Sequence, residues 1–338
     1  MTLALPFVAV GSLGGTISMT PSATAGGVVP TLDAAQLTAS IPGLNAVAEI
    51  GAASILRLPS ASLSTSDVLQ SLAWAEEQVR DGAMGVVLTQ GTDTIEETAF
   101  LLDLYWSHAQ PLIVTGAMRT PLSAGADGPA NLLAAVQVAV SPDSRGRGVL
   151  VVMNDTIHAA RFVAKGDALS VQAFVSPDFG PLGRVIEGSP TYLGAPLHRT
   201  VLAKPSTPLP RIALVTALLG DDGELASAAI HAGYEGVVVA GFGAGHVSAA
   251  FARRIESLTQ QVPVVVASRT GGGCTATATY GFEGSEIDLA KRGALLAGWL
   301  SPLKARLVLA ALLGANTPAS DLAARLAEWG KLRGNAEH

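Results

Sequence analysis

The chain of 338 residues contains a single cysteine, Cys274, so it can form neither an internal disulfide nor a cysteine-based zinc cluster. Its six histidines are scattered without an HxxxH-type pair, which gives little support to a metal site. Basic residues are also few, and the net charge is −6 with a pI of about 5.5. Nucleic-acid binding favours a basic surface. We therefore expect no metal ion and no nucleic-acid partner.

Long runs of bulky apolar residues are missing as well. Alanine, glycine and valine supply much of the apolar content, so no stretch is expected to span a membrane. The first ten residues, MTLALPFVAV, lack the basic region of a signal peptide and continue directly into a glycine motif. We interpret them as leading into the first strand and expect a cytoplasmic protein. The composition that is present, 49% hydrophobic and 14% charged, predicts a compact fold rather than disorder.

Apolar strand-like runs alternate with amphipathic segments along a chain that is long for one hydrophobic core. Strands that are apolar on both faces and separated by helices predict parallel sheets covered on both sides. Residues 190–210 are rich in proline and lack periodicity. We predict two α/β domains, each a mostly parallel sheet flanked by helices, at 1–190 and 211–338, joined by a linker at 191–210. The strands predicted in the first domain are 7–10, 53–58, 84–89, 111–118 and 148–154.

Polar clusters follow several of these predicted strands. They are GSLGGT (11–16), PSAS (59–62), TQGTDT (89–94) and TGAMRT (115–120). In α/β folds ligands bind at the carboxyl ends of the strands. We therefore expect these four loops to share one binding region.

The glycines of the first loop fit no phosphate-binding motif. Gly11 and Gly14 are three apart and no lysine follows, so both the dinucleotide fingerprint and the P-loop are disfavoured. The loop alone leaves two interpretations open. It is either a plain turn, or a site where glycine amides beside Thr16 donate to an anion or a developing oxyanion.

The TQGTDT loop contains more polar side chains than a turn requires. Thr94 and Glu97 form a capping-box pattern, so we predict a helix start there with Thr94 as its cap. This leaves Thr92 and Asp93 to explain. A carboxylate buried in a strand-end pocket is costly without a cationic partner, and a substrate ammonium group would be one.

Lys165 is the only lysine among the first 203 residues. It is either a solvated surface residue or a proton-transfer group, a role that lysine can fill and arginine cannot. It follows a predicted strand closely enough to reach the same region. A threonine hydroxyl is a weak nucleophile and needs help of this kind.

Motifs distributed over residues from about 5 to about 335 resemble the bacterial-type L-asparaginase/glutaminase family. They are GGTI (14–17), TQGTDTIEETAFLLD (89–103), GAMR (116–119), ADGPANL (126–132), GVLVVMND (148–155) and SPLKARLVL (301–309). The resemblance implies a larger N-terminal and a smaller C-terminal domain, with active sites completed by a neighbouring subunit of a homodimer or homotetramer. It implies hydrolysis of L-asparagine to L-aspartate and ammonia without a cofactor, and it allows minor glutaminase activity.

The resemblance also assigns roles to individual residues. Thr16 matches the threonine that is acylated, and Thr92 matches a second threonine in a triad with Lys165 and Asp93. Ser60 matches the serine that binds the substrate α-carboxylate, and Asp93 also takes the α-ammonium group. The remaining residues of the predicted site are Gly15 and Gly91 in the loops, Ala117 near the side-chain amide, and His246 and Tyr280.

Three features depart from the family pattern. Many relatives carry a catalytic tyrosine on the loop after GGTI, but this chain has no tyrosine before Tyr105. His246 stands where relatives place an asparagine near the substrate, and as a residue at a helix start it also has a plain structural interpretation. Tyr280 is the closest match to a glutamate that some relatives lend across the subunit interface.

Two other functions remain as alternatives. One is a non-catalytic amino-acid sensor on the same fold, although binding alone needs no proton relay. The other is the amidase subunit of a tRNA-dependent amidotransferase. Such subunits carry an additional N-terminal domain, for which GGTI at residue 14 leaves no room.

Overall fold

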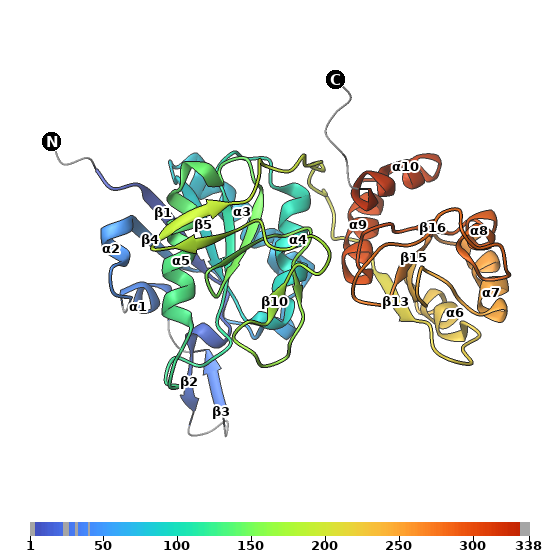
Figure 1. Ribbon diagram of the computed structural model, residues 1–338, viewed down its shortest axis with the longest axis horizontal. Helices are drawn as coiled ribbons and strands as arrows, with labels where there is room; N and C mark the ends of the chain where they lie inside the picture. Colours follow the sequence, from blue (N-terminus) through green and yellow to red (C-terminus); the bar gives the residue numbers. More distant parts are fainter. Residues whose placement is uncertain (1–3, 23–26, 31–32, 40, 332–338) are drawn as a thin grey trace. The chain divides into compact units, whose positions relative to one another are not determined.

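The computed structural model describes residues 4–22, 27–30, 33–39 and 41–331. The chain divides into two compact units, Met1–Val201 and Leu202–His338 (Figure 1). This division falls inside the segment 191–210 that the sequence predicts as a linker. The sheet of the first unit extends two residues into that segment, because its last strand ends at Tyr192.

The first unit is built on an eight-stranded sheet with the order β12-β11-β8-β7-β6-β5-β1-β4. The five strands from β7 to β4 are parallel, whereas β8, β11 and β12 extend the sheet in antiparallel fashion. The strands are β1 Phe7–Ser12, β4 Glu49–Ser54, β5 Gly85–Thr89, β6 Leu112–Thr115, β7 Val149–Met153, β8 Thr156–Ala159, β11 Gly183–Ile186 and β12 Ser189–Tyr192.

Helices cover both faces of this sheet (Figure 1). A Cβ on Gly85 would meet Ala139 of α5, whereas one on Gly11 would meet Trp74 of α3, so these two helices pack on opposite faces. Leu37 and Leu44, from α1 and α2, join the α5 side of the core, and α4 packs beside α3. The helices are α1 Ala34–Ala39, α2 Leu44–Val47, α3 Thr65–Arg80, α4 Ile95–Tyr105 and α5 Gly128–Val140.

Two predictions about the strands of this unit need correction. The strand expected at 53–58 is β4, which lies almost entirely before it. Ile55 and Leu56 instead donate their N–H groups to the carbonyl of Ser12, at 2.8 and 3.1 Å, and so lead the chain along the glycine loop. The antiparallel strands β8, β11 and β12 were not predicted, because each has only four residues and none forms a long apolar run.

Two hairpins complete the first unit. Strands β9 Ala164–Lys165 and β10 Phe174–Val175 pair with each other, as do β2 Met19–Ser22 and β3 Gly27–Pro30. The β2–β3 hairpin extends away from the sheet below α5 in Figure 1.

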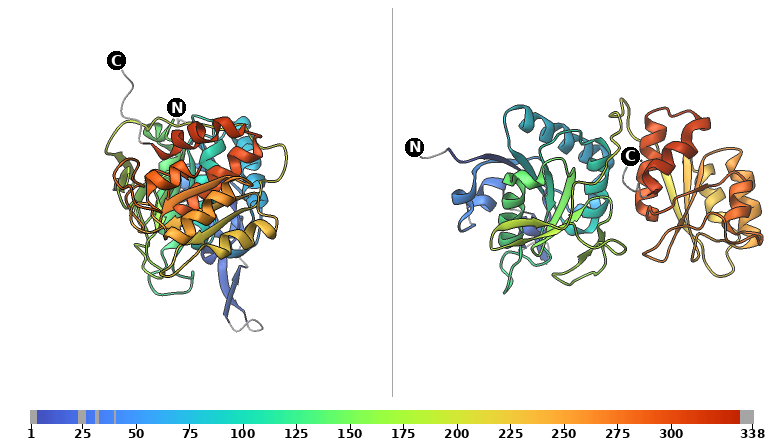
Figure 2. Two further views of the ribbon diagram at one scale, coloured as in Figure 1. Left: turned by 90° about the vertical axis from the view of Figure 1, so that its right-hand side faces the viewer. Right: turned by 45° about the horizontal axis from the view of Figure 1, so that its top comes forward.

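The second unit is a four-stranded parallel sheet with the order β13-β14-β15-β16. Helices α7 and α9 lie on opposite sides of this sheet (Figure 2). Phe251 and Ile255 of α7 pack against one face, and Leu309 of α9 lies against Gly236 on the other. The elements are β13 Ile212–Thr216, α6 Glu224–His231, β14 Gly236–Gly241, α7 Ala249–Thr259, β15 Val264–Ser268, α8 Glu286–Lys291, β16 Leu295–Leu296, α9 Pro302–Gly314 and α10 Ala319–Gly330. Two domains of mostly parallel sheet flanked by helices are therefore confirmed.

Candidate active site

The loops that follow β1, β4, β5 and β6 meet at the carboxyl end of the sheet, as predicted. A Cβ on Gly15 would lie 1.9 Å from the backbone nitrogen of Gly91, and Gly15 has a φ of +88°. Any side chain at this position would therefore push the two loops apart. Gly14, with a φ of +107°, similarly lies against the backbone of Leu58. These glycines bring the segment before Thr16 onto the TQGTDT loop, so their role is close approach as well as turning.

Lys165 lies at the centre of the polar contacts at this end of the sheet. Its Nζ donates to Thr92 Oγ1 at 3.0 Å and to Asp93 Oδ1 at 3.1 Å. Thr92 is buried, and the Lys165 side chain is only 16% exposed. Lys165 therefore reaches the region that these loops share, as predicted. A lysine between a threonine hydroxyl and a carboxylate is suited to proton transfer.

Ser60 joins this group from the loop after β4. It belongs to the 3-10 turn η2, Ser60–Ser62, whereas Thr92 and Asp93 belong to η3, Thr92–Thr94. The buried hydroxyl of Ser60 donates to Asp93 Oδ2 at 3.2 Å and accepts the N–H of Asp93 at the same distance. A Cβ on Gly91 would lie 2.5 Å from Ser60 Oγ, so glycine is needed there.

Asp93 is not the buried carboxylate that the sequence pattern predicts. The Asp93 side chain is 64% exposed and already has Lys165 as its cationic partner. Its exposed carboxylate is therefore open to a second cation, such as an ammonium group, without a large desolvation cost.

The predicted capping role of Thr94 is wrong. Thr94 occupies the N-cap position of α4, but its side chain accepts no hydrogen bond from the first turn of that helix. Its hydroxyl instead donates to the carbonyl of Ser60 at 3.1 Å and accepts from Gln90 Nε2 at 3.3 Å. The side chain of Thr94 therefore joins two loops and does not cap the first turn of α4.

The loop around Ala117 is held by Asp127, the residue before α5. Its carboxylate accepts the N–H groups of Met118 and Arg119 at 2.9 and 2.8 Å, and Asn131 donates both to it and to the carbonyl of Gly116. Gly116 in turn lies against Thr92, because a Cβ there would approach its Cγ2 to 3.5 Å. Ala117 is thus placed beside the Thr92 loop.

Thr16 begins the 3-10 turn η1, Thr16–Ser18, directly after Gly15, and its side chain is half-buried. It lies one residue from the contact between Gly15 and Gly91. Many asparaginases carry a tyrosine in the segment that follows. Residues 23–26 of this segment lie outside the described residues. The nucleophilic role of Thr16 stays a prediction.

His246 and Tyr280 belong to the second unit, where their rings contact each other with centroids 4.8 Å apart. Glu286, which was not predicted from the sequence, has a fully buried carboxylate that faces His246 Nε2 at 3.2 Å. The N–H groups of Thr279 and Tyr280 also donate to Glu286, both at 2.7 Å. Glu286 lies in the first turn of a helix, where acidic residues are common, so no local sequence signal marked it as a site residue.

Burial raises the pKa of Glu286, but the hydrogen bonds from the N–H groups of Tyr280 and Thr279 and from His246 lower it more, and the pKa ends below its ordinary value. The carboxylate is therefore ionised at neutral pH.

Within the described ranges, no group of three or more His, Cys, Asp or Glu side chains could hold a metal ion. The described residues also form no helix that is long and apolar enough to cross a bilayer.

Comparisons with known proteins were made for the whole chain. The family model described as "Asparaginase, N-terminal" matches residues 7–197, and the model "Glutaminase/Asparaginase C-terminal domain" matches residues 211–325. The chain is 38% identical to an L-asparaginase of Bacillus licheniformis over 76% of this chain and 80% of that protein. It is 34% identical to a probable periplasmic L-asparaginase of Haemophilus influenzae, over 90% of this chain and 88% of the relative.

A solved structure gives the same result. The crystal structure of a probable cytoplasmic L-asparaginase from Campylobacter jejuni superimposes with a TM-score of 0.85 and 31% identity, covering 95% of this chain and 99% of that one.

Proposed function

The chain belongs to the asparaginase family, and we propose that it hydrolyses L-asparagine to L-aspartate and ammonia through an ester formed on Thr16. The observation that carries this proposal is the position of Lys165 Nζ, which bridges Thr92 Oγ1 and Asp93 Oδ1. A lysine in this position can pass a proton to and from a threonine hydroxyl. The relatives named above are L-asparaginases, which supports the same reaction.

The reaction proceeds by two displacements. The hydroxyl oxygen of Thr16 attacks the side-chain amide carbon of asparagine, and backbone N–H donors at the glycine loop stabilise the negative charge that develops on the amide oxygen. Thr16 loses its proton, the leaving nitrogen gains one, and ammonia departs to leave a β-aspartyl ester. Water then attacks the ester, which releases aspartate and restores the Thr16 hydroxyl.

Lys165 and Thr92 manage the protons in both steps, because their contact gives a path between an ammonium and a hydroxyl. The recognition residues surround them. Ser60 binds the substrate α-carboxylate, and the exposed carboxylate of Asp93 binds the α-ammonium group. Gly15, Gly91 and Ala117 form the walls of the site. This scheme needs no cofactor.

The assay that tests the proposal is ammonia release from L-asparagine, L-glutamine and their D-forms by the purified protein. We expect L-asparagine to be the best substrate, with minor turnover of L-glutamine, because one extra methylene changes binding by only about 1–3 kcal/mol. Calorimetric binding of L-asparagine without any ammonia release would contradict the proposal and favour an amino-acid sensor.

The assembly and location of the protein are further parts of the proposal. We infer a homodimer or homotetramer in which His246 and Tyr280 contribute to substrate binding. We also infer a cytoplasmic location, since the similar protein from Campylobacter jejuni is described as a probable cytoplasmic L-asparaginase. The Haemophilus influenzae relative is named periplasmic, so cell fractionation is the needed test of location. Light scattering tests the assembly, and an active monomer at assay concentration would exclude the shared site.

A further inference from the structure

Two residues next to the reacting groups hold the segments that bring Ser60 and Lys165 to the site. Thr94 ends η3 and Glu96 lies in the first turn of α4, within a few residues of Thr92 and Asp93. Thr94 contacts the loop of Ser60, and Glu96 contacts the strand of Lys165. One short stretch of chain therefore connects to both the binding side and the proton-transfer side of the site.

The hydroxyl of Thr94 contacts the turn that carries Ser60. The carbonyl of Ser60 accepts the N–H of Leu63, which closes the η2 turn, and also the hydroxyl of Thr94 at 3.1 Å. The hydroxyl of Thr94 is itself oriented by the fully buried side chain of Gln90, whose Nε2 donates to it at 3.3 Å. Because the Thr94 hydroxyl both donates and accepts a hydrogen bond, it has one preferred orientation. The turn that presents Ser60 Oγ is held in one orientation by the same contact.

The side chain of Glu96 contacts the strand that carries Lys165. Glu96 Oε2 accepts the backbone N–H of Lys165 at 2.8 Å. Lys165 belongs to β9, which pairs with β10 through only two residues on each strand. A ladder this short is marginal by itself, and a hydrogen bond to a carboxylate is stronger than one between neutral groups. Glu96 is thus a main support for the backbone that carries the lysine.

We propose that Thr94 and Glu96 are positioning residues with separate effects on catalysis. Thr94 holds Ser60 in place and so sets the affinity for the substrate α-carboxylate. Glu96 holds the backbone of Lys165 and so sets the rate of proton transfer. The inference rests on the proposed function, since it assigns the binding role to Ser60 and the proton relay to Lys165.

The test of Thr94 uses two variants and a matched control. Thr94→Val removes the hydroxyl and Thr94→Ser retains it, while Thr98→Val makes the same change at a buried position one turn further along α4. We expect Thr94→Val to raise KM for L-asparagine roughly threefold to tenfold with kcat little changed, as for the loss of one hydrogen bond. Thr94→Ser restores KM, and Thr98→Val leaves it unchanged.

A truncated substrate locates this effect. 3-Aminopropanamide is asparagine without its α-carboxylate, so Thr94→Val should change its kcat/KM much less than that of L-asparagine. Equal losses on the two substrates, or an equal loss in Thr98→Val, would overturn the role of Thr94.

The test of Glu96 relies on a rescue. Glu96→Leu removes the acceptor, whereas Glu96→Gln keeps an oxygen that can accept the Lys165 N–H. We expect Glu96→Leu to lower kcat by about 10- to 100-fold, the cost of a small displacement of a catalytic group, with KM nearly unchanged. Glu96→Gln should recover most of this rate. A loss of the same size in both variants, or one confined to KM, would overturn the role of Glu96.

Binding of the product separates failure of this inference from failure of the proposed function. Calorimetry with L-aspartate measures the α-carboxylate site without turnover, and Thr94→Val should weaken this binding while Glu96→Leu should not. A wild-type protein that binds L-aspartate but releases no ammonia contradicts the proposed function, and the aspartate affinities then still decide the role of Thr94. Equal aspartate affinity in wild type and Thr94→Val would overturn that role alone.

Discussion

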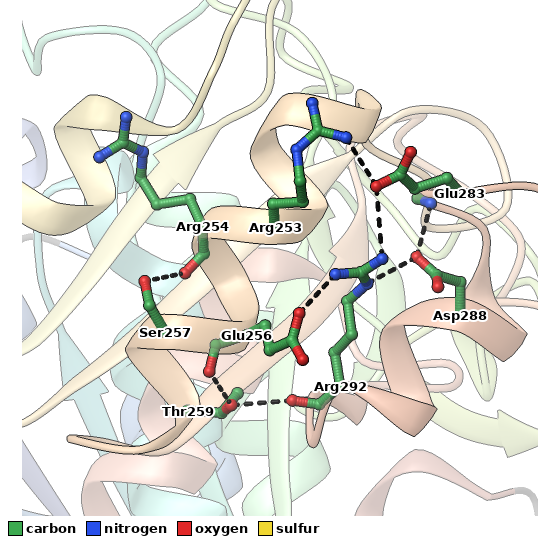
Figure 3. A network of polar contacts seen from close by, with 9 residues as sticks. Arg253, Arg254, Glu256, Ser257, Thr259, Glu283, Asp288 and Arg292 are labelled. Carbon is green, nitrogen blue, oxygen red and sulfur yellow. Dashed lines mark hydrogen bonds and ion pairs between the residues drawn. The ribbon is translucent and has the colours of Figure 1, made fainter.

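Each unit contains a cluster built around one basic side chain, and the two clusters differ in what surrounds that side chain. In the second unit, Arg292 contacts the carboxylates of Glu256, Asp288 and Glu283 at 2.6, 2.8 and 3.4 Å (Figure 3). In the first unit, the ammonium group of Lys165 contacts the carboxylate of Asp93 and the hydroxyl of Thr92.

The difference separates a structural cluster from a reactive one. The guanidinium of Arg292 keeps its charge at all working pH values and joins acids from α7, α8 and the loop before α8, so it can only hold these elements together. Hydrogen bonding with Asp288 raises the pKa of Arg292 further. An ammonium group beside a threonine hydroxyl can release and regain a proton, so the first cluster is the one suited to chemistry.

The largest expected effect concerns the nucleophile that the first cluster serves. Thr16→Ala should abolish ammonia release from L-asparagine, because no other group replaces the attacking oxygen. Its thermal midpoint should stay close to that of the wild type, since the half-buried Thr16 side chain occupies a loop outside the core. Unchanged activity in this variant would falsify the assignment of Thr16.

A reciprocal exchange of the two basic residues sharpens the comparison next. Lys165→Met should lower kcat by about two to four orders of magnitude, the range for loss of a general acid–base, and Lys165→Arg should not restore it. Arg292→Lys should leave kcat nearly unchanged. A Lys165 variant that changes KM alone would make this residue a binding group and remove the contrast between the clusters.

The third effect separates recognition from catalysis at Asp93. A charge-assisted hydrogen bond to the substrate ammonium contributes about 1.5–3 kcal/mol, or roughly one to two decades in kcat/KM. Succinamic acid is asparagine without that amino group. Asp93→Ala should therefore lose much of its activity on L-asparagine and proportionally far less on succinamic acid. Similar losses on both substrates would restrict Asp93 to the relay with Lys165.

The smallest effect is a pH dependence of stability in the second unit. Because the folded-state pKa of Glu286 is lowered, its carboxylate stabilises the fold above the ordinary carboxyl pKa, and this contribution disappears as the pH falls through the lowered value. The difference in thermal midpoint between wild type and Glu286→Gln should therefore be largest near neutral pH and shrink below pH about 4. A difference that is constant with pH would show that ionisation of Glu286 does not matter.

Much of the architecture was predictable, because it depends on patterns within short segments. Runs such as 84–89 and 148–154 are apolar on both faces, and the helices between them keep their periodicity, so the parallel core of each unit follows from local preference and burial. Errors appeared where the local signal was weak or ambiguous. The strand β4 is a partly exposed edge strand made mostly of small residues, and the neighbouring segment 53–58 contains the bulkier apolar residues.

Part of the candidate site was visible in the sequence for a similar reason. Lys165 was noticeable because it is the only lysine among the first 203 residues. The TQGTDT loop was noticeable because it has more polar side chains than a helix cap requires. These signals identify residue types that are unusual in their surroundings. They do not identify partners, and the capping interpretation of Thr94 and the assumed burial of Asp93 were wrong for that reason.

The sequence by itself determined the alternation of strands and helices in the parallel part of each unit, the loops that meet at the carboxyl end of the first sheet, and the family to which the chain is similar. Only the tertiary structure decided that Thr94 donates to the carbonyl of Ser60, that Glu96 accepts the N–H of Lys165, and that Glu286 contacts His246. These three contacts join segments that are 34, 69 and 40 residues apart, respectively. A hydrogen bond depends on the meeting of two atoms in space, and local pattern carries no information about which distant backbone group will arrive there.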